Sequence, residues 1–331
     1  MKTALKIVVS FIGLLLVSIS VFVIYCLATY RHDYSSVELP NIHASKDPAV
    51  IAQGEYLANA VAHCPACHEP SYYVRRRTLT ANLSDLRGGF VFHAGPFGTF
   101  HAANLTSDPA TGIGNVSDAQ LARAIRHGVD RHGRYAAFMA FSVGNMADED
   151  LTALVSYLRT LPPKSNPVPA DEWGIVAKLM ASKFVPHDEP KMKYVPEGGV
   201  SVERGEYLAN GPAGCYNCHT RRDPMNGFAM VGARLSGNND ADPDETEPGF
   251  EIAAPNLTSD PETGRTGAWT EDQFVSRLRA GRTVAGSHMP WENFARMTED
   301  DLRSLYRYLH SLPPVKNDVG PTRRRAGWKK T

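Results

Sequence analysis

Four of the five cysteines in this 331-residue chain lie in two short units, and a histidine closes each unit. The first unit is "HCPACH" at residues 63–68, and the second is "GCYNCH" at residues 214–219. Both units therefore contain the pattern Cys-x-x-Cys-His. Three kinds of chemistry use such a cysteine pair: a zinc site, a dithiol redox pair, and the covalent attachment of a c-type haem.

The surroundings of the two units favour haem attachment. A zinc site needs four ligands, and neither repeat contains a second cysteine pair to complete one. A thioredoxin-like pair is expected near a βαβ pattern, which this sequence lacks. On one helical turn the two thiols can bond the two vinyl groups of one porphyrin, and the following histidine then lies under the iron. We therefore expect two haem c groups, attached through Cys64, Cys67, Cys215 and Cys218, with His68 and His219 as axial ligands.

The second axial ligand of each iron decides between electron transfer and catalysis, because a methionine there closes the iron and raises its potential. Two methionines follow each unit, 70–78 residues beyond its histidine. We predict Met139 and Met289 as ligands, since Pro290 keeps Met289 out of a helix interior and Met139 aligns with it. The spacing alone leaves alternatives open, namely Met146, Met297, His63, His127, His132 and His288.

The chain contains an internal repeat. "GEYLAN" at 54–59 recurs at 205–210, "NLTSDP" at 104–109 recurs at 256–261, and "SYLRTLPP" at 156–163 recurs as "RYLHSLPP" at 307–314. The cysteine units lie 151 residues apart, and the other matches lie within a residue or two of that offset. We therefore expect two copies of one domain, at 48–163 and 199–314, joined by a proline-rich linker at 164–198 and followed by a basic tail at 315–331.

Short helices are expected to position these residues. Capping boxes at 117–120 and 270–273 predict the start of one helix in each copy. Apolar residues at i, i+3, i+4 and i+7 predict a last helix that Pro162 or Pro313 ends, and a first helix is expected from Gly54 or Gly205. A further short helix is expected in the linker at 175–184, as a connector that packs on one domain, with contact to a membrane surface as the weaker alternative. Because no long alternating pattern appears, we predict an all-α fold.

The N-terminus contains an uncharged run of 22 residues, from Ile7 to Ala28, preceded by Lys2 and Lys6. Such a helix would be about 33 Å long, enough to cross a bilayer core of about 30 Å. We expect a membrane anchor at 1–30 rather than a cleaved signal, which usually has a shorter apolar region. Either segment exports the rest of the chain. Cys26 is expected to be a buried apolar side chain of this segment.

Charge excludes one class of partner and marks two segments. Lysine plus arginine equals aspartate plus glutamate at 35 each, whereas a nucleic-acid-binding protein usually has a basic excess. The acidic stretch at 238–251 is predicted to be a solvated loop, with a docking face as the alternative and a metal site as a weaker one, because calcium-site spacing is absent. The tail, with Arg323, Arg324, Arg325, Lys329 and Lys330, is predicted to be disordered, with contact to anionic lipid or an acidic partner as the alternative.

The repeated motifs, above all "APNLTSDPETG" at 254–264, resemble those of class I cytochrome c domains. More narrowly, the chain is similar to the multihaem cytochrome c subunits of membrane-bound bacterial dehydrogenases for alcohols, aldehydes, gluconate or sorbitol. The resemblance implies a transmembrane helix followed by two tandem class I domains, in the inner membrane with the haem domains in the periplasm. It also implies electron transfer from a partner dehydrogenase to quinone or a terminal oxidase, without catalysis by this chain. A peroxidase-like or thiosulfate-oxidising dihaem enzyme and a stand-alone carrier to an oxidase are the alternatives.

The resemblance also implies contacts within each domain, and it has limits. Tyr56 and Tyr207 are expected to pack on the last helix near Tyr157 and Tyr308, and Pro255 is expected to lie beside the haem on the histidine side. Related subunits often carry three haems, whereas this chain has two attachment units. Ala103 and Ala140 replace Pro255 and Pro290 in the first copy, so its haem is expected to differ in potential or in its methionine bond.

Overall fold

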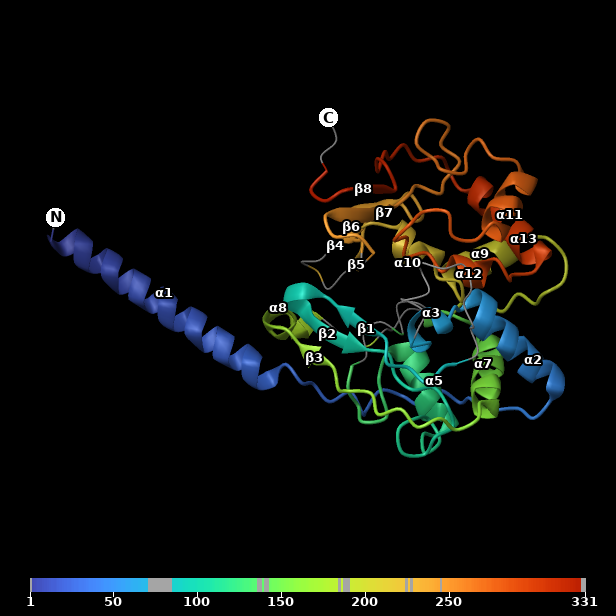
Figure 1. The fold of residues 1–331 in the computed structure, drawn as a ribbon. Helices are drawn as coiled ribbons and strands as arrows, with labels where there is room; N and C mark the ends of the chain where they lie inside the picture. The colour runs from blue at the N-terminus through green and yellow to red at the C-terminus, as the bar shows by residue number, and fades with distance from the viewer. Residues whose placement is uncertain are drawn as a thin grey trace.

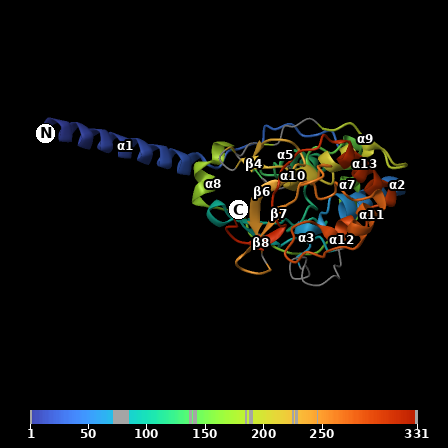
Figure 2. The same ribbon diagram turned by 90° about the horizontal axis from the view of Figure 1, so that it is seen from above.

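The computed structural model describes residues 2–70, 85–135, 139, 143–183, 186, 191–223, 226, 229–244 and 246–328. A single long helix, α1 (Lys2–Thr29), extends away from a folded body (Figure 1). The view from above shows the same separation (Figure 2). By length and composition α1 can cross a membrane, in agreement with the predicted anchor, and Cys26 is its buried side chain.

The same order of helices occurs twice in the body. The first copy contains α2 (Pro48–Tyr56), the π-helical turn η1 (Leu57–Val61), α3 (Pro65–His68), α5 (Asp118–His127) and α7 (Asp148–Thr160). The second copy contains α9 (Val202–Asn210), α10 (Cys215–His219), α11 (Glu271–Arg279), α12 (Trp291–Phe294) and α13 (Glu299–Ser311). The first helix of each copy begins earlier than predicted, because the side chains of Asp47 and Ser201 cap it by accepting bonds from backbone N–H groups.

The first and last helices of each copy cross at very short range. A Cβ atom on Gly54 would lie 1.9 Å from the backbone oxygen of Ala153, and one on Gly205 would lie 2.0 Å from that of Ser304. Only glycine permits backbones to approach so closely. The repeated glycine of "GEYLAN" is therefore a packing requirement of the crossing between α2 and α7, and between α9 and α13.

The predicted capping boxes are confirmed. The Ser117 hydroxyl accepts from the Gln120 N–H, and the Gln120 side chain accepts from the Ser117 N–H. Thr270 and Gln273 make the same two bonds at the start of α11. α5 ends at Gly128, whose φ of 65° fits the left-handed conformation of a helix C-terminus.

The prediction of an all-α fold is wrong. Over the residues that the structure describes, 41% are helical and 11% are in strands, which form three small sheets. The sheets are formed by β1 (Val91–His93), β2 (Gly98–His101) and β3 (Glu172–Trp173); by β4 (Arg222–Asp223) and β5 (Ala229–Met230); and by β6 (Asn238–Pro243), β7 (Phe250–Ala254) and β8 (Arg323–Arg325). Five of these eight strands are only two or three residues long, too short for the alternating pattern that identifies a strand. The longest, β6, consists of Asn, Asp, Ala and Pro and has no alternation of large apolar and polar residues.

The linker packs on the first copy, as predicted for a connector. β3 pairs with β2, with Trp173 opposite Gly98. The short helix α8 (Ile175–Leu179) follows and is continued by a 3-10 turn, η3 (Ala181–Lys183). The predicted helix at 175–184 is therefore shorter and irregular, and residue 184 lies outside the described residues.

The acidic stretch and the basic tail pair with each other. β8 of the tail adds to β7, and β7 pairs with β6 of the acidic stretch. Arg323 forms ion pairs with Asp244 and Glu247, and Arg324 forms one with Glu251 at 2.7 Å. The prediction of a disordered tail is therefore wrong for residues 323–325, and Lys329 and Lys330 lie outside the described residues. The acidic stretch is exposed over much of its length, as predicted, but it forms paired strands and not a loop.

The two copies share part of one core. One apolar cluster contains Leu208, Leu302 and Leu305 of the second copy together with Leu57 and Val61 of the first. α12 of the second copy contacts η1 of the first. The two cysteine units are therefore held in a fixed relation by direct packing between the copies.

Candidate cofactor site

Each cysteine unit forms a single helical turn, α3 or α10, entered from a left-handed residue. Gly214 precedes Cys215 with a φ of 58°, and His63 precedes Cys64 with a φ of 43°. A residue other than glycine takes this conformation at a cost of about 1 kcal/mol or more. The residue before the first cysteine is thus left-handed in both copies, although only the second copy has a glycine there.

The two histidines are held in one tautomer by backbone carbonyls. His68 Nδ1 lies 2.7 Å from the oxygen of Ala103, and His219 Nδ1 lies 2.8 Å from that of Pro255. Because a carbonyl oxygen only accepts, Nδ1 carries the proton and the Nε2 lone pair is left for a metal. Burial lowers the pKa of both rings, so both stay neutral. The bond comes from the backbone, and so Ala103 replaces Pro255 without changing it.

A large cavity lies beside the second unit. Its volume is about 1510 Å³, and its wall includes Cys215, Cys218 and His219. Much of the remaining wall is apolar, with Leu278, Phe294, Leu305 and Leu309 among its residues. Cys67, from the other unit, also lines it. Two thiols and a neutral imidazole on one wall of an apolar cavity fit a covalently attached haem.

Two arginines give the same cavity a positive side. Arg265 and Arg277 both line it, and burial together with the charge of Arg265 lowers the pKa of Arg277. Arg277 donates to the Thr283 hydroxyl at 2.7 Å and lies 3.8 Å above the Trp291 ring, and Arg265 donates to the Thr322 hydroxyl at 2.8 Å. Within the described ranges neither forms an ion pair with a carboxylate. Two neighbouring cations of this kind fit the two propionates of a haem.

The structure separates the candidate methionines of the second copy. Met289 lines the cavity that His219 lines, whereas Met297 is completely buried in the apolar core. In the first copy Met139 packs against the core and is half-buried, and Met146 is completely buried. The choice of Met139 and Met289 as ligands stays a prediction. Ala140, which aligns with Pro290, lies outside the described residues.

Three of the alternative histidines have other partners. His63 Nδ1 lies 3.2 Å from the Val61 oxygen, and its ring meets the Phe294 ring edge-on at 5.7 Å. His288 Nε2 lies 3.1 Å from the Pro243 oxygen, and His132 Nε2 accepts from Arg131 at 3.0 Å. His127, the fourth, is half-buried near the end of α5.

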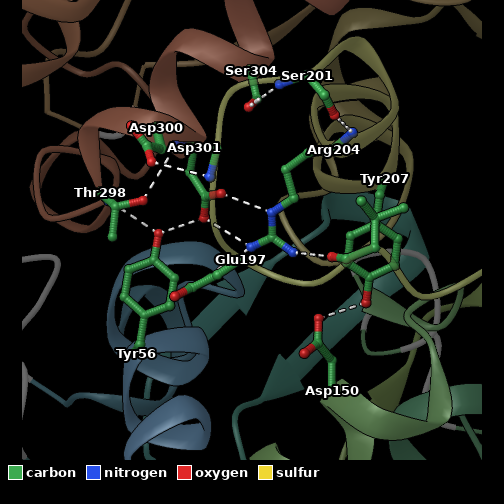
Figure 3. A network of polar contacts seen from close by, with 12 residues as sticks. Tyr56, Asp150, Glu197, Ser201, Arg204, Tyr207, Thr298, Asp300, Asp301 and Ser304 are labelled. Atoms are coloured by element: carbon green, nitrogen blue, oxygen red, sulfur yellow. Dashed lines mark hydrogen bonds and ion pairs between the residues drawn. The ribbon is translucent and has the colours of Figure 1, made fainter.

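A polar network joins the two copies (Figure 3). The Tyr56 hydroxyl donates to Asp301 at 2.7 Å and accepts from the Thr298 N–H at 3.1 Å. The Tyr207 hydroxyl donates to Asp150 at 2.6 Å and accepts from the Ala147 N–H at 3.2 Å. Every residue of the first set lies 151 positions from its counterpart in the second. Each tyrosine hydroxyl thus bonds the start of the other copy's last helix.

The first helix of each copy packs on the last helix of the same copy, as expected. The hydroxyls of Tyr56 and Tyr207 bond the opposite copy, however, and not Tyr157 or Tyr308. Asparagines of the same first helices reach those partners instead: Asn59 bonds the Tyr157 hydroxyl at 3.3 Å, and Asn210 bonds that of Tyr308 at 2.7 Å.

The network is symmetric in shape but not in charge. In the second copy Arg204 is buried and bonds both oxygens of Asp301, at 2.7 and 2.9 Å. Gln53 stands at the equivalent position of the first copy. Burial raises the pKa of Asp150, and the bond from Tyr207 opposes that rise. Neither this network nor the arginines of the cavity were predicted from the sequence. The recurrence of Tyr56 and Asp150 at the repeat offset was the available signal for the network.

No protein-family model matches the chain. The chain is 32% identical over 292 residues to the cytochrome c subunit of the quinone alcohol dehydrogenase of Komagataeibacter europaeus, covering 83% of this chain and 58% of the relative. It is 31% identical over 288 residues to the gluconate 2-dehydrogenase cytochrome c subunit of Pantoea cypripedii, covering 80% and 60%. It is 27% identical over 234 residues to a diheme cytochrome c-type protein of Cereibacter sphaeroides, covering 66% and 74%.

The predicted resemblance is confirmed by these relatives. The chain spans about three fifths of the length of the two dehydrogenase subunits that it matches.

Proposed function

We propose that this chain, as a relative of the cytochrome c subunits of dehydrogenases, is an electron-transfer cytochrome without a substrate reaction of its own. The observation that carries the proposal is the helical turn with two thiols and a neutral histidine, which occurs twice. Covalently bound haem c supplies the one-electron chemistry when it is attached there. The protein supplies the attachment, the orientation and the surrounding charge.

The roles of individual residues follow from their places. Cys64 and Cys67 form the thioethers of the first haem, and Cys215 and Cys218 form those of the second. His68 and His219 bind iron through Nε2, because the carbonyls of Ala103 and Pro255 hold their Nδ1 protons. Met139 and Met289 bind iron from the other side. The domains of the two haems extend over 48–163 and 199–314.

Two haems in one chain are expected to exchange electrons directly. Cys67 and Cys218, the second cysteines of the two units, line the same cavity. The attachment points of the two haems would therefore border a common cavity. The relative named as a diheme cytochrome supports the count of two.

The cellular role is proposed from α1 and from the names of the relatives. α1 anchors the chain in the inner membrane of a bacterium, and Lys2 and Lys6 favour a cytoplasmic N-terminus and a periplasmic body. The electron donor is the catalytic subunit of a dehydrogenase, and the acceptor is quinone or a terminal oxidase. A dihaem enzyme is the alternative, but Met289 on the cavity wall favours a closed iron over an open one.

The test is purification from native membranes in mild detergent, with intact-mass measurement and identification of co-eluting subunits. We expect a mass that includes two haems and a dehydrogenase subunit whose substrate reduces both of them. The variant Cys64→Ser/Cys67→Ser serves as a control that should retain one haem. An oxidised protein with a high-spin haem, active on peroxide or thiosulfate, would contradict the electron-transfer proposal. Elution without a dehydrogenase would favour a stand-alone carrier.

A further inference from the structure

We propose that α8 and the end of α1 form a surface that lies in the interfacial region of a phospholipid bilayer. The body would then be seated on the membrane in a fixed orientation, and not only tethered to it. This inference rests on the proposed role of α1 as a membrane anchor.

α8 lies beside the C-terminal end of α1, where the apolar segment ends. α8 contacts α1, and both views place it beside the end of α1 that enters the body (Figures 1 and 2). The apolar run of α1 ends at Ala28, and the first charged residue after it is Arg31. Tyr30, two residues later, lies with its ring centroid 6.1 Å from that of Trp173, which directly precedes α8 and its N-cap Gly174. α8 is therefore level with the point where the apolar span ends.

The side chains around this point are those that favour a membrane–water interface. Lys178 Nζ lies 5.1 Å from the centroid of the Tyr30 ring, and Arg31 Cζ lies 5.4 Å from it. Tyrosine and tryptophan place an apolar ring and a polar tip at the headgroup level. Lysine and arginine extend their charges toward the phosphates while their stems stay with the apolar layer.

α8 also has an inner and an outer side. Ala177 is buried and packs with Tyr135 in a small apolar cluster that includes Trp173. Ile175, two residues before it, is 52% exposed. A short helix with one buried side and an exposed isoleucine beside cations fits a surface that enters the boundary between headgroups and acyl chains.

The proposed membrane-contacting surface on α8 is connected to the cofactor site by strand pairing and packing. Trp173 pairs with Gly98 in the sheet of β1, β2 and β3. Trp173 and Ala177 also line the cavity that Cys67 and His219 line. Contact of α8 with lipid would therefore fix the direction in which this cavity faces the membrane.

The experiment uses the full chain in nanodiscs of phosphatidylethanolamine and phosphatidylglycerol, with a phospholipid that carries a diazirine near its glycerol end. Irradiation, digestion and mass spectrometry locate the labelled residues. We expect label on α1 and on residues 173–180. Val202 at the start of α9, 38% exposed, is the matched apolar control and should remain unlabelled.

The outcomes distinguish the two proposals. Label on α1 without label on residues 173–180 would overturn the proposed contact of α8 with lipid and leave the proposed anchor intact. The absence of label from both overturns the anchor as well. The variant Ile175→Glu should lose the label on α8 several-fold with an unchanged haem spectrum, whereas Val202→Glu should not. If α8 were labelled as strongly in Ile175→Glu as in the wild type, the proposed contact of α8 with lipid would also be overturned.

Discussion

At the scale of single residues, a backbone carbonyl sets the chemistry of each proposed iron ligand. The Nδ1 proton is held by Ala103 in one copy and by Pro255 in the other. Since both bonds come from the main chain, the side chain at this position affects packing but not the tautomer. The replacement of proline by alanine therefore gives no reason to expect a different histidine bond in the first copy.

The proposal that Met289, and not Met297, binds iron can be tested by substitution. Met289→Leu removes the sulfur on the cavity wall, and it should abolish the sulfur-to-iron charge-transfer band of one haem only. Met297→Leu conserves volume in the core, so it should keep that band and cost less than about 1.5 kcal/mol of stability. Optical spectra of the two oxidised variants decide the question. Loss of the band in Met297→Leu instead would show that the assignment is wrong.

The raised pKa of Asp150 predicts how the stability of the chain depends on pH. Its pKa is raised by burial, so the folded state binds this proton more tightly than the unfolded chain does. Stability is therefore lost as pH rises from about 4, the ordinary pKa of aspartate, to the raised pKa of Asp150, and the loss is complete above it. Asparagine does not titrate, so Asp150→Asn should not lose stability in this way. The free energy of unfolding of the variant, relative to that of the wild type, should therefore increase as pH rises across this range.

The measurement is denaturant unfolding of the detergent-solubilised chain at a series of pH values. Asp301→Asn is the matched control, because it breaks the ion pair with buried Arg204 and should cost about 3 kcal/mol or more at neutral pH. A difference between Asp150→Asn and the wild type that does not change with pH would contradict the prediction.

The site residues that could be predicted are those with local spacing. The two cysteines and the histidine of each unit lie within five consecutive positions, so the sequence alone identifies them. Arg265 and Arg277 could not be found in this way, because they come from a loop and from a helix and share only the cavity that they line. Tyr56 and Asp301 are 245 residues apart, and no local rule connects them.

At the scale of elements, the same contrast between local and distant determinants holds. Helix starts at Ser117 and Thr270 were predicted correctly, because a capping box is a contact over three residues. β8 was missed, because it is a strand only through its pairing with β7, with Arg324 opposite Glu251. A run of arginines has no strand pattern of its own, and its partner lies more than seventy residues earlier.

This pairing makes a prediction for the C-terminal strand. Arg324 is buried and bonds Glu251, the Val319 oxygen and the Asn239 oxygen. Arg324→Ala leaves those groups without their donor and should destabilise the chain by about 3 kcal/mol. Neighbouring Arg325 is exposed, and Arg325→Ala should cost less than about 0.5 kcal/mol. Thermal unfolding of the two variants measures the difference, and equal losses would show that β8 is not held by this ion pair.

At the scale of the whole molecule, the reciprocal tyrosines join the two copies that carry the proposed haem sites. Tyr56→Phe/Tyr207→Phe removes both hydroxyls between the copies and leaves Asp150 and Asp301 each short of a donor. The expected cost is about 1–3 kcal/mol for each site, and electron exchange between the haems should slow. Each haem should keep its own spectrum.

Flash reduction of one haem, followed by its equilibration with the other, measures this exchange. Tyr157→Phe/Tyr308→Phe is the control, because these hydroxyls bond asparagines within their own copies. It should lower stability without slowing the exchange. An unchanged rate in Tyr56→Phe/Tyr207→Phe would show that apolar packing alone sets the distance between the haems.

The reciprocity of these contacts also says something about descent. In a two-fold symmetric homodimer, residue i of one subunit meets residue j of the other, and j meets i in return. Tyr56 with Asp301 and Tyr207 with Asp150 follow that rule at one constant offset. The two halves therefore meet as two identical subunits would, which is the arrangement left when a gene for a self-associating single-haem ancestor is duplicated and its copies are fused. Gln53 in the first copy and Arg204 in the second are then one of the positions at which the two halves have diverged.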